Sequence, residues 1–140
     1  MRMTSIKEKE QAVVEEFELF DDWMDKYNHI IEMGRTLPVI DDQYKDEKYL
    51  IKGCQAQVWL HAEQKDGRVH FTADSDALIT KGIVALLIRV LSGQKPDEII
   101  DADMSFIDEI GLKEHLSQTR SNGLVNMIKQ MKLYALAIKG

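Results

Sequence analysis

Residues 57–72 read QVWLHAEQKDGRVHFT, and this stretch decides the fold. Val58, Leu60 and Ala62 occupy every second position, which is the pattern of a strand with one buried face. The alternation returns at residues 69–72 after Asp66-Gly67, a dipeptide typical of tight hairpin turns. The stretch therefore predicts a β-hairpin with strands at residues 57–62 and 69–72.

A two-stranded hairpin is only marginally stable by itself, so a further strand is expected beside it. Residues 49–52, with the sequence YLIK, are the natural candidate for this strand. The sequence thus predicts a small antiparallel three-stranded sheet.

The chain before the hairpin is predicted to be helical. Ser5 and Glu8 form a possible capping box at the start. Asp21-Asp22 predicts a cap where one helix gives way to a second, and Gly34 is expected at the C′ position that ends the second helix. Apolar residues recur at spacings of three and four, which predicts one buried helical face. They are Val13, Val14, Phe17, Phe20, Met24, Tyr27, Ile30 and Ile31.

The chain after the hairpin is also predicted to be helical. Residues 74–76 (Asp-Ser-Asp) are interpreted as a capping cluster before residues 77–91, which are apolar nearly all round and are expected to form a buried central helix. Short helices are predicted beyond it at residues 96–100, 104–110 and 112–116, followed by a last helix capped at Ser121 or Asn122. Its expected apolar face holds Val125, Ile128, Met131, Leu133, Tyr134 and Ile138.

The expected fold class is therefore α+β, with a small antiparallel three-stranded sheet packed against several helices. The length of 140 residues suits one domain over residues 1–140. The formal net charge is −6, and the acidic excess lies in residues 1–50. An acidic chain lacks the positive charge that attracts phosphate backbones, so no nucleic-acid partner is expected.

Nothing in the sequence predicts export or a membrane span. Residues 1–11 are polar and charged, unlike a signal peptide. The longest strongly apolar run, residues 82–91, contains Arg89 and is too short to cross a bilayer. One cysteine cannot form an intramolecular disulfide. The expectation is a cytoplasmic protein without a membrane partner.

Cys54, the only cysteine, is the leading candidate for a reactive group. Gly53 gives its backbone the freedom for a sharp turn. Lys52 is close in sequence, and a nearby cation would favour the nucleophilic thiolate. The alternative is an inert thiol, because a lone cysteine is more often a small buried hydrophobe.

Other side chains offer weaker signals. Asp74 and Asp76 could be paired carboxylates, although acids before a helix are usually caps. Arg120 could pair with an acid or a partner, or could simply be solvated. A Cys-His hydrolase would need a histidine near Cys54, and no histidine has a spacing that predicts one.

The string KGCQAQVW at residues 52–59 resembles the active-site segment of the SufE family of iron–sulfur-cluster biogenesis proteins. The resemblance covers roughly residues 15–138. Ala56 stands where serine is common in the family, and Asn122 where glutamine also occurs. Three further motifs resemble family segments in the same order: YNHIIEMG at residues 27–34 with Leu37-Pro38, DSDA at residues 74–77 with Lys81-Gly82, and HLS at residues 115–117 with RSNGL at residues 120–124.

The resemblance implies a partner and a reaction. SufE-like proteins receive sulfur from a pyridoxal-phosphate cysteine desulfurase of the SufS type. Cys54 would attack the desulfurase persulfide, become a persulfide itself and pass the sulfur to an iron–sulfur scaffold. The family also stimulates the desulfurase by clearing its active-site cysteine. This is a sulfur-transfer partner rather than a stand-alone enzyme, and neither a cofactor nor a metal site of its own is implied.

The same resemblance places further residues near the acceptor loop. Gly53 and Gln55 flank Cys54 directly. Asp74 and Asp76 would brace the loop through its backbone or meet a basic desulfurase surface, and Arg120 would steady the anionic persulfide or contact the partner. Cys54 is expected on a loop that is tucked against apolar neighbours at rest and extends into the partner, with Gly53 as its flexible point.

Two other functions stay open. The protein could bind a desulfurase or scaffold without carrying sulfur, as a non-covalent interaction module. It could also be a thiol redox sensor that forms a sulfenate or a mixed disulfide at Cys54.

Overall fold

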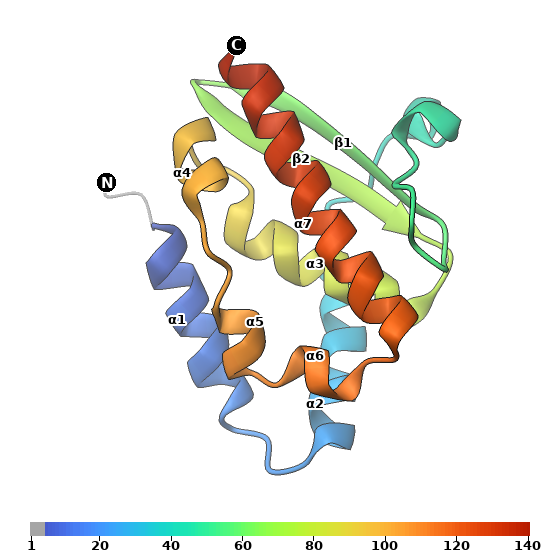
Figure 1. The fold of residues 1–140 in the computed structure, drawn as a ribbon, viewed down its shortest axis with the longest axis vertical. Helices are drawn as coiled ribbons and strands as arrows, with labels where there is room; N and C mark the ends of the chain where they lie inside the picture. The colour runs from blue at the N-terminus through green and yellow to red at the C-terminus, as the bar shows by residue number, and fades with distance from the viewer. Residues whose placement is uncertain (1–4) are drawn as a thin grey trace.

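The computed structural model describes residues 5–140, which form a β-hairpin covered by helices (Figure 1). This mixture of helix and antiparallel strand is the predicted α+β class. The strands are β1 (Val58–Lys65) and β2 (Arg68–Ser75). The helices are α1 (Ile6–Phe17), α2 (Trp23–Met33), α3 (Leu78–Leu91), α4 (Pro96–Asp101), α5 (Phe106–Glu109), α6 (Leu112–His115) and α7 (Gln118–Lys139), with the 3₁₀ turns η1 (Gly34–Thr36), η2 (Asp42–Tyr44) and η3 (Glu47–Tyr49).

The predicted hairpin is confirmed, and its strands are longer than expected. Lys65 pairs with Arg68 across a two-residue turn in which Asp66 has φ 55° and Gly67 has φ 75°. Positive φ at both positions matches the twist of antiparallel strands, and Asp and Gly tolerate it best. The inward face carries the predicted alternation of buried side chains, with Val58 and Leu60 on β1 and Val69, Phe71 and Ala73 on β2.

The predicted third strand is wrong, and the sheet in residues 5–140 has two strands. Among residues 49–52 only Leu50 makes a bridge, to Trp59, and the neighbouring Ile51 N–H donates to Val58 O at 2.8 Å. On the N-terminal side, the residues up to Tyr49 form η3, which is capped by the Asp46 carboxylate. On the other side Gly53, with φ 84°, turns the chain away. Residues 49–52 are therefore too short a stretch to continue the ladder.

The buried core centres on α3, which lies across the middle of the molecule in Figure 1. Nearly every side chain of α3 is buried, as its all-round apolar sequence predicts. β2 packs against α3, whereas β1 packs against α7. The Tyr134 hydroxyl of α7 donates to Leu60 O at 3.0 Å, which ties the last helix to the hairpin.

α2 and α3 approach each other closely at Gly82. A Cβ built at Gly82 would fall within the contact radius of the Ile30 carbonyl oxygen and 2.8 Å from Ile30 Cγ2. A Cβ at Gly34 would lie 3.2 Å from the Gly82 backbone nitrogen. The glycines therefore allow two helix backbones to pack almost in direct contact.

Several helix ends differ from the prediction. Ser5 and Asp22 cap α1 and α2 as expected. Gly34 was expected at the C′ position that ends α2, and it is instead the C-cap residue, with φ −61°, and leads into η1. The last helix begins one turn earlier than predicted, with Ser117 as its cap in place of Ser121 or Asn122. The Ser117 hydroxyl accepts from the Arg120 N–H at 3.3 Å, which satisfies a free donor of the first turn.

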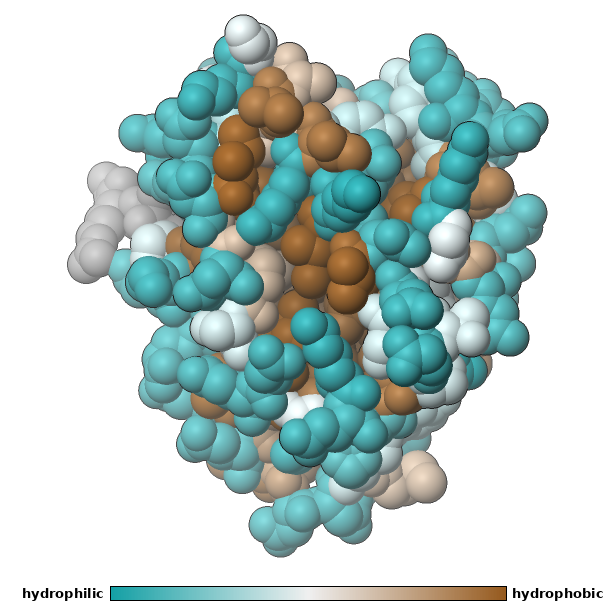
Figure 2. All heavy atoms as spheres, in the orientation of Figure 1, coloured by the Kyte–Doolittle hydropathy of each residue, from teal (hydrophilic) through white to brown (hydrophobic). Residues whose placement is uncertain are grey.

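Some predicted core positions lie at the surface. Met24 of α2 is 64% exposed, and Val125 and Leu133 of α7 are 50% and 48% exposed. Hydrophobic residues gather along the face over α7 (Figure 2). The buried side of α7 is formed by Gly123, Leu124, Met127, Met131 and Ala135.

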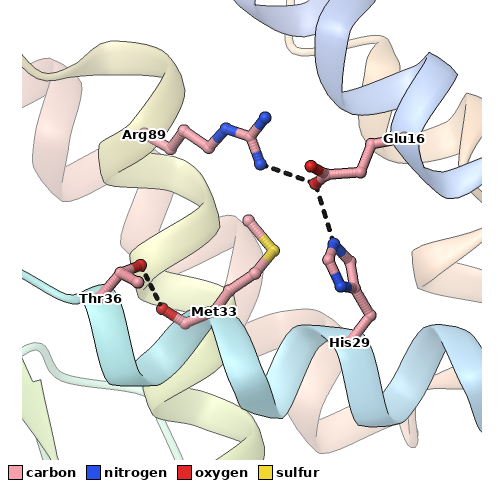
Figure 3. A network of polar contacts seen from close by, with 5 residues as sticks. All are labelled: Glu16, His29, Met33, Thr36 and Arg89. Carbon is pink, nitrogen blue, oxygen red and sulfur yellow. Dashed lines mark hydrogen bonds and ion pairs between the residues drawn. The ribbon is translucent and has the colours of Figure 1, made fainter.

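A polar network joins α1, α2 and α3 beside the core (Figure 3). The Glu16 carboxylate accepts from Arg89 Nη1 at 2.7 Å and contacts His29 Nε2 at 2.9 Å. Burial opposes ionisation of Glu16, but the bonds from Arg89 and His29 outweigh it and hold the pKa of this carboxyl below its ordinary value. Among residues 5–140, no helix has both the length and the apolar character that a membrane span requires.

Candidate functional site

Cys54 lies on the loop between η3 and β1, where this loop meets α7. Its side chain is half-buried, and its Sγ lies 3.7 Å from Gly123 O, within range of a weak hydrogen bond. A Cβ built at Gly123 would lie 3.4 Å from Cys54 Sγ. Because this helical glycine has no side chain, the thiol lies close to the α7 backbone. The loop thus rests against α7 with the thiol turned toward the helix.

The thiol opens onto a cavity of about 310 Å³ between the loop, α3 and α7. Of the candidates from the sequence, Cys54, Gln55, Asp76 and Arg120 line this cavity, whereas Gly53 and Asp74 lie outside it. The remaining lining residues are Ala56, Ala77, Thr80, Ile83, Thr119, Gly123 and Met127. One nucleophile therefore faces a small pocket with a mixed polar and apolar wall.

The electrostatic setting of Cys54 differs from the expectation. Burial raises the pKa of the Cys54 thiol above its ordinary value, because a buried thiolate loses hydration. Lys52 was expected to favour the thiolate, but its side chain is exposed and lines a different groove. In this arrangement the thiol is kept protonated and weakly nucleophilic at neutral pH.

Two side chains hold the ends of the loop through its backbone. Asn126 of α7 donates from Nδ2 to Gly53 O at 3.2 Å, and Gly53 has the positive φ that lets its carbonyl face α7. At the other end, Asp76 accepts from the Gln57 N–H at 3.0 Å, and its own N–H donates to Gln57 O at 3.3 Å. Neither contact involves the cysteine side chain, so the loop is fixed without any covalent or ionic bond to Cys54.

Contrary to the sequence prediction, Asp74 does not cap α3 but pairs with two lysines. β2 continues to Ser75, so the carboxylates of residues 74 and 76 do not cap α3, and no side chain caps that helix. Asp74 pairs with Lys45 at 2.6 Å and with Lys81 at 3.3 Å. These bonds tie the segment before η3 and the first turns of α3 to the end of the hairpin.

The ion pairs of Asp74 predict an acid-dependent contribution to stability. Burial opposes its ionisation, but bonds from Lys45, the Ser75 N–H and Lys81 outweigh it and hold the pKa of Asp74 below the ordinary 3.8. A lowered folded pKa stabilises the fold fully above the unfolded pKa, and this contribution is lost as pH falls through the folded value. Asp74→Asn should therefore lower the free energy of unfolding by about 1 kcal/mol near neutral pH, and the difference should shrink below pH 3.8.

Urea unfolding of both proteins between neutral pH and pH 3 would measure this difference. Asp21→Asn is a suitable control, because Asp21 is an exposed acid in the turn between α1 and α2. A difference between Asp74→Asn and the unsubstituted protein that stays constant into strong acid would show that its ion pairs do not stabilise the fold.

Arg120 projects from the first turn of α7 at the mouth of the cavity. Its backbone N–H is held by the Ser117 hydroxyl at 3.3 Å, and its side chain is exposed. Within residues 5–140, no carboxylate lies at ion-pair distance from its guanidinium. A cation that is fixed at its base and unpaired at its tip remains available for an anion at the cavity mouth.

Sequence reasoning missed two residues of this site. Gly123 entered it only as part of the RSNGL motif, although a glycine inside a helix costs about 1 kcal/mol and therefore signals a close approach. Asn126 gave no signal, because its contact with Gly53 joins residues that are 73 positions apart. Both lie on the α7 face toward the loop.

The cavity does not have the residues of a hydrolase or a metal centre. No histidine lines it, so Cys54 has no histidine partner in the cavity wall. Among residues 5–140, no group of three or more His, Cys, Asp or Glu side chains is placed to hold a metal ion. The nucleophilic side chain with the best-defined place in the cavity wall is the Cys54 thiol.

Comparison with known proteins identifies relatives over most of the chain. The family model described as SufE, Fe-S metabolism associated domain, matches residues 11–135. An uncharacterized SufE-like protein of Rhizobium meliloti is 36% identical over 135 residues, which cover 93% of this chain and 94% of that one. SufE-like protein 1, chloroplastic/mitochondrial, of Arabidopsis thaliana is 37% identical and covers 94% of this chain, but the match spans 36% of the longer plant protein.

A solved structure shows the same fold. The solution structure of a hypothetical protein from Thermus thermophilus matches with a TM-score of 0.77 and 20% identity, over 92% of this chain and 94% of that one. The fold and the site define a small α+β protein that carries one half-buried thiol on a loop against its last helix. The chain belongs to the SufE family, whose model describes an association with iron–sulfur metabolism.

Proposed function

We propose that this protein accepts sulfur as a persulfide on Cys54 from a pyridoxal-phosphate cysteine desulfurase of the SufS type, stimulates that enzyme, and passes the sulfur to an iron–sulfur scaffold. The observation that carries the proposal is the position of the only thiol, which lies on a loop at a small cavity in a chain of this family. The protein is thus a sulfur-transfer partner rather than a stand-alone enzyme.

The transfer is an exchange at sulfur that needs no outside oxidant. The Cys54 thiolate attacks the outer sulfur of the desulfurase persulfide, the sulfur–sulfur bond of that persulfide breaks, and the desulfurase cysteine leaves as a thiolate. Cys54 then carries the sulfane sulfur. Removal of this sulfur frees the desulfurase cysteine for its next turnover, which accounts for the stimulation.

The position of Cys54 supports a cycle of shelter and exposure. In the resting arrangement burial keeps the pKa of the thiol high, so it reacts slowly with stray electrophiles. Release of the Asn126 and Asp76 contacts would free the loop at both ends, with Gly53 as the turning point. Exposure to solvent would bring the pKa back toward its ordinary value, so the nucleophile forms where the partner meets it.

The charged residues have complementary parts in this cycle. Arg120 at the cavity mouth would steady the anionic persulfide once Cys54 has returned. Asp76 would reset the loop by accepting from the Gln57 N–H, whereas Asp74 would act indirectly by holding the end of β2 with Lys45 and Lys81. A reducing cytosol suits a lone thiol of this kind, and we propose that location.

Intact-mass measurement tests the proposal on the unsubstituted protein. After incubation with a purified SufS-type desulfurase and free cysteine, we expect one added sulfur, located on Cys54 by peptide mapping. One sulfur and two oxygens add nearly the same mass, so a second sample is treated with dithiothreitol. This removes a sulfane sulfur but leaves a sulfinate. No added mass, or a mass that survives the reductant, would contradict sulfur transfer to Cys54.

A further inference from the structure

A second concavity lies directly beside the acceptor loop, between residues 47–52 and α7. It has a volume of about 700 Å³, and its walls combine charged, aromatic and aliphatic side chains. It is separate from the cavity at Cys54, with which it shares none of the lining residues. The lining residues are Glu47, Lys48, Tyr49, Leu50, Ile51, Lys52, Asn126, Lys129, Gln130, Leu133 and Tyr134.

The charge of this groove is opposite to that of the chain. Lys48, Lys52 and Lys129 line it with a single acid, Glu47, whereas the whole chain has a net charge of −6. All three lysines are exposed, and none has a carboxylate at ion-pair distance within residues 5–140. Other lysines, such as Lys45 and Lys139, do pair with acids. The groove therefore concentrates uncompensated positive charge.

The groove also offers apolar contact. Leu133 of α7 is 48% exposed and lines the groove. Tyr49 and Tyr134 also line the groove, and the hydrogen bond from the Tyr134 hydroxyl to Leu60 O holds its ring in place. A ligand that is complementary to this groove carries negative charge, which pairs with the lysines, and an apolar side chain, which packs on Leu133. An acidic protein segment with interspersed apolar residues has this composition.

The groove and the cysteine cavity meet at the Gly53 turn. Ile51 and Lys52 line the groove, and Cys54 and Gln55 line the cavity, so one short loop separates them. Asn126 faces the groove while its amide donates to Gly53 O. A chain lying in the groove would thus touch both the loop that carries the thiol and the residue that holds that loop.

We propose that this groove is the docking site for an acidic, partly apolar segment of the desulfurase that delivers sulfur to Cys54. The inference rests on the proposed function and adds the chemistry of the partner surface. Charge attraction brings the segment to Lys48 and Lys129, and its contact with Asn126 competes with the Gly53 carbonyl and loosens the loop. Docking and exposure of the thiol are thereby coupled.

Charge reversal in the groove tests the proposal. Lys48→Glu with Lys129→Glu changes the groove and leaves Lys52, which is close to the thiol, in place. Lys65→Glu with Lys95→Glu is the matched control, because these exposed lysines lie at the hairpin turn and before α4 and give the same change in net charge. Sulfur transfer from a SufS-type desulfurase is measured as a function of the concentration of each variant, at low and at moderate salt.

For the groove variant we expect KM to rise about tenfold at low salt, with full persulfide formation at saturating protein. The control should match the unsubstituted protein, whose own KM should rise with salt. A groove variant with unchanged KM and normal persulfide would overturn the docking site alone, whereas an unsubstituted protein that gains no sulfur would overturn the proposed function as well. Sedimentation that shows the groove variant losing a dimer would assign the groove to a second copy of this chain and overturn the proposal.

Discussion

Gly82→Ala should lower the free energy of unfolding by about 3 kcal/mol or more, and Tm by roughly 10 °C. The added methyl group would fall within the contact radius of the Ile30 carbonyl oxygen and 2.8 Å from Ile30 Cγ2. A backbone carbonyl cannot rotate away as a side chain can, so α2 and α3 must move apart. That separation opens the buried face that α3 shares with the rest of the core.

The sign of the effect makes this test decisive. In an ordinary helix, glycine to alanine raises stability by up to about 1 kcal/mol, because the unfolded chain loses freedom. Gly34→Ala is the graded comparison, since its methyl group would meet the Gly82 nitrogen at 3.2 Å and should cost less. Thermal unfolding followed by circular dichroism measures all three proteins. A Gly82→Ala protein as stable as the parent would refute the close crossing of α2 and α3.

The hairpin could be predicted because its determinants are local. Alternation within residues 57–72 and the Asp66-Gly67 turn act over a few positions, and no other part of the chain has to be known. The prediction of a third strand was wrong because residues 49–52 lie between two other local structures that compete with a strand. The Asp46 cap and the Gly53 turn leave only Leu50 in position to bridge β1, and the weak strand pattern of residues 49–52 cannot compete.

The candidate site likewise combines local features, which the sequence could predict, with long-range contacts, which it could not. Cys54 could be found in the sequence because a lone cysteine between glycine and glutamine at the start of a hairpin is a local feature. Its surroundings depend on α7, which brings Gly123 and Asn126 to the loop from far along the chain. Asp76 lines the cavity of Cys54 and Asp74 lies outside it, and the interpretation of both as caps ignored the possibility that β2 continues through Asp74 to Ser75.

Lys52 shows how closeness in sequence differs from electrostatic contact. Only Gly53 separates it from Cys54 along the chain, yet the turn at this glycine sends the lysine into the groove and the thiol toward α7. Burial is then the dominant influence, and it raises the pKa of Cys54. A carrier with a sheltered resting state requires a poorly reactive thiol. The raised pKa of Cys54, where Lys52 was expected to lower it, therefore supports the proposed mechanism.

Cys54→Ser should abolish the gain of sulfur entirely while leaving the fold intact. A hydroxyl cannot form a persulfide, and the chain has no other cysteine. The thiol makes only a weak, long contact with Gly123 O from a half-buried position, so its replacement should change the free energy of unfolding by no more than about 1 kcal/mol. Intact mass after incubation with desulfurase and cysteine gives the first readout, and urea unfolding gives the second.

The turnover of the desulfurase in the presence of this variant separates the remaining functions. If Cys54 is the carrier, stimulation should be lost together with the added sulfur, because the desulfurase cysteine is no longer cleared. Cys54→Ala is the companion variant, since it leaves no polar atom on the side chain and should behave alike in the transfer assay. Full stimulation by both variants would instead identify a non-covalent interaction module. A parent protein that gains oxygen but no sulfur would identify a redox sensor, in which the same half-buried thiol reacts with peroxide rather than with a persulfide.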